Sequence, residues 1–341
     1  MSELIFRFRR HCLVKRLRSA NYRNFDLLIN YPGDREANST DYGATGVQGG
    51  ATLERLLGDG YAVRAQTSSE EHADALDDRG AEVALATLDD PDALRTASEG
   101  VATVALTLPQ GYLSDAVRRF GHNAIDAAEA AVDLLVSNTS TRIPDEETDV
   151  AAFEDKRALE RYLDDSDVPF VSLRPTLYME NFALPQGAQG LVEDDVVAYP
   201  TPPELQASWI SADDLAGFAA ETLARPDWAG RHIDVGGPEV LDGAAIADRF
   251  GGALGRPIEY QQVPIDAFDA QLTGMMGPEA GAMISEMYRR SEAHLGSGLF
   301  ETDAAELRRS FPDVELTPLK AWVEQQDWQQ LAGTAQATEN A

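Results

Sequence analysis

The chain has 341 residues, which is enough for one large α/β domain or for a nucleotide-binding domain with a smaller second portion. Its formal net charge is −30 and its pI is near 4.4, which argues against a nucleic-acid partner, because a phosphate backbone requires a basic surface. Only three of the 28 basic residues are lysines. This composition predicts a surface adapted to high salt, as in a halophile, with an ordinary acidic protein as the alternative.

The single cysteine, Cys12, excludes an intrachain disulfide and a thiolate metal site, so we expect a reducing, cytoplasmic location. The histidines are scattered without the spacing of metal ligands, and we expect no metal. Basic residues at positions 15, 16 and 18 interrupt what would be the apolar region of an export signal. No apolar run approaches the roughly 18 to 20 residues of a spanning helix, so we expect no membrane contact.

Residues 1–36 differ from the rest of the chain in charge. They hold eight basic and four acidic residues, a local charge of +4, so that residues 37–341 carry −34. We interpret them as an atypical basic N-terminal extension. One alternative is a basic arm that contacts nucleic acid or a membrane; the other, which we favour, is an appended or misread segment.

The next stretch, residues 37–42, is too polar for the buried central strand that should lead into a nucleotide-binding loop. Either residues 25–31 supply this strand and an unusual insertion follows, or the first forty residues come from a wrong start or a shifted reading frame. We put forward the second explanation as a hypothesis.

Three glycines at a spacing of three, Gly43, Gly46 and Gly49, follow directly. Such glycines let the backbone turn tightly, approach a pyrophosphate and pack a following helix, which we expect over residues 46–58 with its N-terminal amides facing the phosphates. Strands predicted over 61–67, 82–85 and 101–108, with a helix over 91–100, continue the alternation. The sequence therefore predicts a Rossmann-like, doubly wound parallel sheet.

The remaining elements follow in chain order. We expect helices over 112–131, 151–163 and 243–254 and a further helix that follows residues 208–214 and ends at 223, strands over 132–136, 169–175 and 231–235, a loop-rich part over 176–203, and helical segments over 267–286 and 317–331. The predicted organisation is an extension (1–36), an NAD(P)-binding Rossmann core (37–175), a substrate-binding portion with returning Rossmann elements (176–331) and a disordered tail (332–341).

Four segments taken together resemble the NmrA-like family of atypical short-chain dehydrogenase/reductase proteins. They are GATGVQG at 43–49, LDDP at 88–91, FEDK at 153–156 and LRPTLYMENF at 173–182, and the resemblance covers about residues 42–330. It implies a protein that binds NAD(P). The family includes reductases of quinones and related compounds as well as non-catalytic proteins that sense the redox state of the cofactor.

The resemblance also assigns catalytic positions. Lys156 falls where the wider superfamily has a lysine that hydrogen-bonds the nicotinamide ribose, whereas the superfamily's catalytic tyrosine, four residues earlier, is replaced by Ala152. Alcohol oxidation and sugar epimerisation therefore lose their main acid/base group. Hydride transfer to a quinone stays feasible, because water can protonate the acceptor afterwards.

The choice between NADP and NAD stays open. Hydroxyls at Ser68 and Ser69 suit either cofactor, the adjacent Glu70 and Glu71 repel a 2′-phosphate, and Thr87 replaces the aspartate that relatives have near the adenine. The full set of expected cofactor-binding residues is Gly43, Thr45, Gly46, Val47, Gln48, Gly49, Ser68, Ser69, Thr87, Leu108, Pro109, Thr139 and Lys156.

Tyr178, Asn181 and Phe182 follow the sixth predicted strand and are expected to face a small-molecule substrate, with core packing as the alternative for the two aromatic residues. We interpret the protein as an NAD(P)H-dependent oxidoreductase that transfers hydride to a quinone or a similar small electrophile. The alternative is a silent redox sensor that acts through a protein partner. The sequence gives no indication of the oligomeric state.

Overall fold

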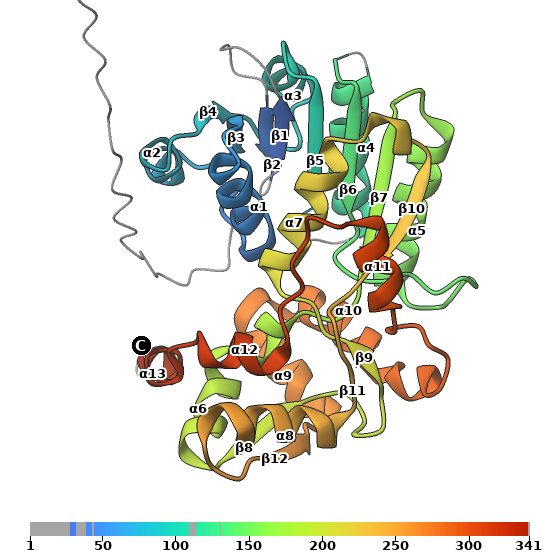
Figure 1. Ribbon diagram of the computed structural model, residues 1–341. Coiled ribbons are helices and arrows are strands. Elements are labelled where there is room, and N and C mark those ends of the chain that lie inside the picture. The colour runs from blue at the N-terminus through green and yellow to red at the C-terminus, as the bar shows by residue number, and fades with distance from the viewer. Residues whose placement is uncertain (1–27, 32–38, 43, 109–113, 130, 340–341) are drawn as a thin grey trace, which may run out of the picture.

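The computed structural model describes residues 28–31, 39–42, 44–108, 114–129 and 131–339. Its centre is an eight-stranded sheet in the order β10-β7-β6-β5-β1-β2-β3-β4 (Figure 1). All strands except β1 run parallel, namely β2 (Ser39–Tyr42), β3 (Ala62–Thr67), β4 (Glu82–Leu85), β5 (Thr103–Thr107), β6 (Leu134–Asn138), β7 (Phe170–Pro175) and β10 (Arg231–Val235). The predicted doubly wound parallel sheet is confirmed.

Helices cover both faces of this sheet, because its strands are apolar on both sides. One buried cluster joins α1 (Val47–Gly58), α2 (Glu70–Asp78), α7 (Ala212–Leu223) and α11 (Ala304–Ser310) to the sheet through residues such as Leu53, Phe218 and Leu307. The other joins α3 (Pro91–Ser98), α4 (Ser114–Glu129) and α5 (Ala151–Asp165) to it through Leu94, Phe120 and Leu159.

The strand that leads toward the glycine loop is β2, despite its polar sequence. It pairs in parallel with β3 and with β5, as the first strand of such a fold does. The strand β1 (Leu28–Tyr31) also joins the sheet, but it runs antiparallel to β2, β3 and β5 and so cannot deliver the chain to the loop. Of the predicted N-terminal extension, residues 1–27 and 32–36 lie outside the described residues.

The smaller portion of the molecule lies at one end of the sheet (Figure 1). Its apolar core includes Phe182, Trp209, Phe250 and Trp322. It consists of η1 (Met179–Ala183), α6 (Pro185–Glu193), β8 (Val196–Tyr199), β9 (Ala207–Ser208), β11 (Val240–Leu241), α8 (Gly243–Leu254), β12 (Glu259–Gln262), α9 (Ile265–Met276), α10 (Pro278–Arg289), α12 (Leu319–Glu324) and α13 (Trp328–Glu339). Two short helices, η2 (Pro226–Trp228) and η3 (Ser291–His294), lie in the connections.

Two sequence predictions are wrong in this portion. The stretch 176–203 is not mainly loop, because it holds η1, α6 and β8, and β8 gains a partner only through pairing with the distant β12. The predicted disordered tail is helical over residues 332–339, where α13 begins with a buried Trp328 and also buries Ala332. The helical segment over 267–286 is two helices, because Gly277 breaks it with a φ of 89° that favours glycine.

Candidate functional site

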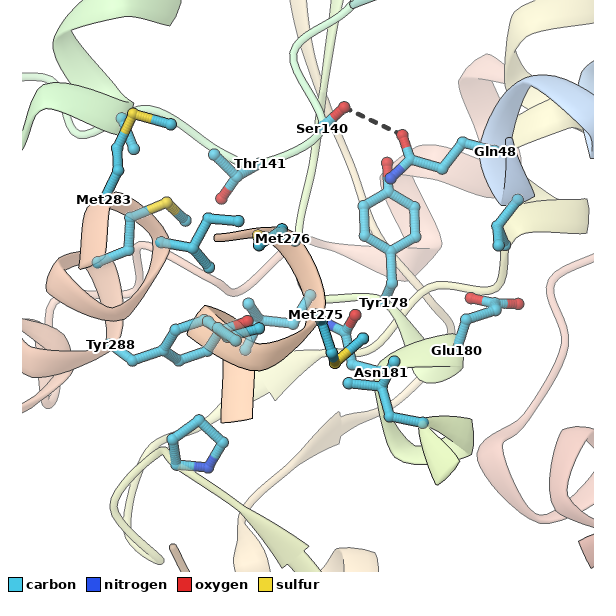
Figure 2. Close-up of a pocket in the computed structure, with 18 of the residues that line it drawn as sticks. Gln48, Ser140, Thr141, Tyr178, Glu180, Asn181, Met275, Met276, Met283 and Tyr288 are labelled. Carbon is cyan, nitrogen blue, oxygen red and sulfur yellow. Dashed lines mark hydrogen bonds between the residues drawn. The ribbon is translucent and has the colours of Figure 1, made fainter. Parts of the chain in front are cut away.

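A cavity of about 370 Å³ lies between the carboxyl ends of the parallel strands and the smaller portion. Thr107, Asn138 and Thr176 line it at the ends of β5, β6 and β7. In an open α/β sheet this is the edge where ligands bind. Figure 2 shows that the cavity has two sides: Gln48 and Glu180 lie on one side of Tyr178, and the methionines of α9 and α10 lie on the other.

The first side includes the N-terminus of α1. Val47, Gln48 and Gly49 line the cavity there, and the helix begins at Gly46 with no side-chain cap and no acidic residue in its first turn. Its first amides are therefore open to an anion. Thr45 and Gly46 form the half-buried turn before the helix and do not line the cavity, and Gly43 lies outside the described residues.

Arg79, at the end of α2, holds this loop in place, and the sequence analysis missed it. Its guanidinium donates to the carbonyl oxygen of Ala44 at 3.1 Å and to that of Gly50 at 2.9 Å. A Cβ atom at Gly50 would lie only 3.3 Å from the Ala44 oxygen, so the backbone approaches itself closely here. No sequence motif marks Arg79, because it reaches the loop from a helix 29 residues further on.

A polar network connects α1 to the end of β6. Gln48 Oε1 accepts a hydrogen bond from Asn138 Nδ2 at 2.7 Å. It accepts a second one from Ser140 Oγ at 3.0 Å (Figure 2). Ser140 has a left-handed φ of 59°, and its amide donates to Asn138 Oδ1 at 2.8 Å. Thr139, which the sequence predicted as a cofactor contact, lines the cavity but bonds through its hydroxyl to the carbonyls of Thr141 and Leu173. Its neighbours Asn138 and Ser140 present the polar groups instead.

Lys156, the residue expected to bind the nicotinamide ribose, lines the cavity from α5. Burial lowers the pKa of its ammonium group to about 8, only partly offset by the charge of Asp155. Asp155 is itself paired with Arg118 at 2.7 Å. Ala152, the position of the missing tyrosine, also lines the cavity one turn before Lys156. The structure thus places a lysine beside the cavity with no tyrosine at the superfamily position.

Glu180 is a second titratable group at the cavity that the sequence analysis did not single out. Its Oε1 accepts hydrogen bonds from the amide of Ala212 at 3.0 Å and from the indole of Trp322 at 3.3 Å, while its Oε2 has no partner among the described residues. Burial raises the pKa of this carboxyl group to about 7. Near neutral pH, Glu180 therefore carries much less charge on the α1 side of the cavity than an ordinary glutamate.

The predicted substrate residues separate into two groups. Tyr178 and Asn181 line the cavity, whereas Phe182 does not and is 2% exposed in the core of the smaller portion. The ring of Phe182 lies 4.4 Å from that of Trp209, centroid to centroid. For Phe182 the expected substrate contact is therefore corrected to core packing.

The wall opposite α1 was also missed. It comes from the helical hairpin α9–α10 and contains Phe268, Leu272, Met275, Met276, Met283 and Met287. Figure 2 labels three of them, Met275, Met276 and Met283. Met283 and Met287 pack against the start of α5. The crowding of four methionines into residues 275–287 was the available signal, because methionine is common on surfaces that adapt to different ligands.

The residues expected near the adenosine lie away from this cavity. Ser68 and Thr87 are exposed after the ends of β3 and β4. Ser69 directly precedes α2, makes no side-chain hydrogen bond to it, and donates its amide to Thr67 Oγ1 at 3.1 Å. Arg64, in β3, donates hydrogen bonds to Glu82 and to the carbonyl oxygens of Ala97 and Glu99. Leu108 lines the cavity, and Pro109 lies outside the described residues.

The described part of the chain contains no cluster of three or more histidine, cysteine, aspartate or glutamate residues that could hold a metal ion. None of its helices is both long enough and apolar enough to cross a membrane.

Comparison with known proteins gives consistent matches. The model of the NmrA-like family matches residues 41–322. An NAD(P)H azoreductase of Xenophilus azovorans is 26% identical over 262 residues, which is 76% of this chain and 89% of the azoreductase.

Two solved structures share the fold. An NADPH-dependent quinone oxidoreductase of Escherichia coli in complex with NADPH superposes with a TM-score of 0.66 at 21% identity, over 83% of this chain and 97% of that one. NmrA, a negative transcriptional regulator in complex with NADP, superposes with a TM-score of 0.64 at 18% identity, over 84% of this chain and 97% of that one.

Proposed function

The chain belongs to the NmrA-like family, and from this premise we propose that it is an NAD(P)H-dependent oxidoreductase that reduces a quinone or a similar small electrophile. One observation carries the proposal: a single cavity joins the open N-terminus of α1, the partly buried Lys156 and an apolar wall of methionines. These are a place for a dinucleotide, a cation beside it and a place for an organic acceptor. The azoreductase and quinone oxidoreductase relatives support the same reaction class.

The residues at α1 fit a dinucleotide. The uncapped amides and the helix dipole favour the pyrophosphate, and Gly49 lines the cavity without a side chain that would stand between the backbone and the ligand. When bound, a reduced nicotinamide supplies a hydride. Lys156 would hold the ribose next to it, and the pKa of Glu180, which burial raises to about 7, leaves less negative charge on this side of the cavity near neutral pH.

The acceptor would lie against α9 and α10. Methionine side chains are flexible and polarizable, so this wall suits flat aromatic acceptors of somewhat different shapes. Ala152 provides no hydroxyl to take a proton from a carbinol, which disfavours alcohol oxidation. Reduction of a quinone needs no such base, because the acceptor gains rather than loses a proton.

The alternative is a non-catalytic NAD(P) sensor that acts through a protein partner. The absence of a tyrosine at position 152 and the fold shared with the regulator NmrA favour it. NADPH oxidation that depends on an added acceptor distinguishes the two functions, because a sensor would bind NADPH without consuming it.

We further propose that the protein works in high salt, because its many acidic side chains repel one another when ionic strength is low. Assays therefore belong in molar potassium chloride.

The test of the proposal compares two lysines. Lys156→Ala should lower the rate of NADPH oxidation with 1,4-naphthoquinone about 10- to 100-fold, because the ribose loses its positioning contact. Lys320→Ala is the matched control, since Lys320 is half-exposed, pairs only weakly with Glu324 at 3.7 Å and does not line the cavity. Equal rates for the two variants would argue against Lys156 as a cofactor residue.

A further inference from the structure

Two tyrosine hydroxyls meet on the acceptor side of the cavity. Tyr199, from β8, and Tyr288, from α10, both line the cavity, and their hydroxyl oxygens lie 2.7 Å apart. Asn181 Nδ2 donates a further hydrogen bond to the Tyr199 hydroxyl at 2.9 Å. Tyr288 lies beside the methionine wall in Figure 2, and its ring packs against Phe268 at 5.0 Å.

The two hydroxyl groups of this pair carry one hydrogen more than the hydrogen bond between them uses. Each hydroxyl carries one hydrogen, but the contact between the two oxygens uses only one of them. The Asn181 amide is a donor and takes up no hydroxyl hydrogen. Within the described residues, no other acceptor contacts either oxygen, so one hydroxyl hydrogen of the pair is left over at the cavity.

A spare donor in an apolar wall is costly unless a ligand uses it, because a buried polar group without a partner loses the energy of its bond with water. Burial raises the pKa of Tyr288 and, to a greater extent, that of Tyr199. Both groups therefore stay protonated over the whole working range of pH and remain hydrogen-bond donors.

We propose that the Tyr199–Tyr288 pair donates this spare hydrogen bond to the acceptor's carbonyl oxygen and stabilises the negative charge that develops there. The inference rests on the proposed function and deepens it, because it requires an acceptor with an oxygen or a comparable lone-pair atom at its reducible end. In the reaction, a quinone gains a hydride from NAD(P)H, which becomes NAD(P)⁺, and the charged oxygen later takes a proton from water to complete the hydroquinone. The pair stays protonated throughout.

The sharing of one hydrogen predicts an unusual pattern among variants. In Tyr288→Phe, the Tyr199 hydroxyl loses its partner and has its own hydrogen to donate, and in Tyr199→Phe the same holds for Tyr288. Each single variant therefore keeps one donor at the cavity. Only the double variant removes every donor of the pair.

The experiment measures kcat/KM for 1,4-naphthoquinone in four proteins: the wild type, Tyr199→Phe, Tyr288→Phe and the double variant. Each single variant should lose at most about threefold and the double variant about 100- to 1,000-fold, the usual effect of removing a donor to a developing oxyanion. Tyr260→Phe is the matched control, since its hydroxyl bonds to Thr201 and it does not line the cavity. NADPH affinity, measured by calorimetry, should be the same in every variant.

A double variant within about threefold of the wild type, or losses that simply multiply, would overturn the shared-hydrogen account. That failure differs from failure of the proposed function. If the wild type binds NADPH but consumes none with any acceptor, the reductase proposal is wrong and the pair has no acceptor to polarise.

Discussion

The two walls of the cavity are built in different ways. On the sheet side, Gln48, Asn138 and Ser140 fix one another through hydrogen bonds, and Arg79 holds the glycine loop from behind. On the other side, Met283 and Met287 of the hairpin α9–α10 pack against α5 mainly through apolar contacts. A fixed wall suits a ligand of constant shape such as a dinucleotide, and an adaptable wall suits acceptors of varying shape.

The largest expected effect is a loss of stability, at a buried ion cluster between α5 and the strands β7 and β10. Glu160 accepts hydrogen bonds from Ser172, from Arg174 and from His232. Glu160→Gln should lower the free energy of unfolding by about 2 to 3 kcal/mol, somewhat less than for a fully buried pair because Arg174 and His232 are partly exposed. Glu82→Gln, which removes an exposed partner of Arg64, should cost about 1 kcal/mol or less in the same urea titration.

The pH dependence of that loss follows from two opposite shifts. Although burial opposes it, hydrogen bonding lowers the pKa of Glu160 to about 2, so its contribution is present above its unfolded pKa of about 4.3 and fades as the pH falls toward 2. The hydrogen bond to Glu160 raises the pKa of His232. The stability that the His232 pairing contributes is therefore present below about pH 6.5 and is lost as the pH rises through the folded pKa of His232. The difference between wild type and Glu160→Gln should therefore be largest between about pH 4.5 and 6.5. A difference that grows above pH 8 would contradict this assignment.

The next effect concerns cofactor binding at the fixed wall, which contains the start of α1. Val47 is 47% exposed and lines the cavity at the start of α1. Val47→Glu should weaken NADPH binding about 100-fold, because a carboxylate would occupy the region that favours the pyrophosphate, while an acid at a helix N-terminus leaves the fold stable. Val240→Glu, at a site that is 43% exposed and outside the cavity, is the control. Calorimetric titration would refute the cofactor site if both variants bound NADPH equally.

The smallest effect concerns the adaptable side. Met283→Ala should raise the KM for the acceptor about threefold to tenfold and leave NADPH affinity unchanged. The effect on KM is small because the flexible neighbouring side chains partly fill the space that the shorter side chain leaves. Met283→Leu keeps the volume and should stay close to the wild type. A change in NADPH affinity as large as the change in KM would mean that the two walls are not separate binding regions.

The same contrast explains what could be predicted from the sequence. Strands such as residues 82–85 and helices such as residues 243–254 carry strong local patterns, and the structure reproduces both sets of bounds. The glycine spacing likewise located α1, and the family resemblance located Lys156.

The missed features depend on contacts between distant segments. Arg79 reaches the loop from another helix, and Tyr199 meets Tyr288 across 89 residues. The strand β8 forms only because β12 pairs with it, and Phe182 is buried by Trp209 rather than exposed to substrate. Local propensity contains no information about such pairings.

The most direct test of the central claim is the oxidation of NADPH by the wild-type protein in molar potassium chloride, followed by absorbance with and without 1,4-naphthoquinone. The account predicts that oxidation requires both the protein and the quinone and saturates with each ligand, with one hydroquinone formed for each NADPH consumed. Binding of NADPH without consumption, for the quinone and for azo compounds alike, would contradict the reductase function and leave the sensor as the better explanation.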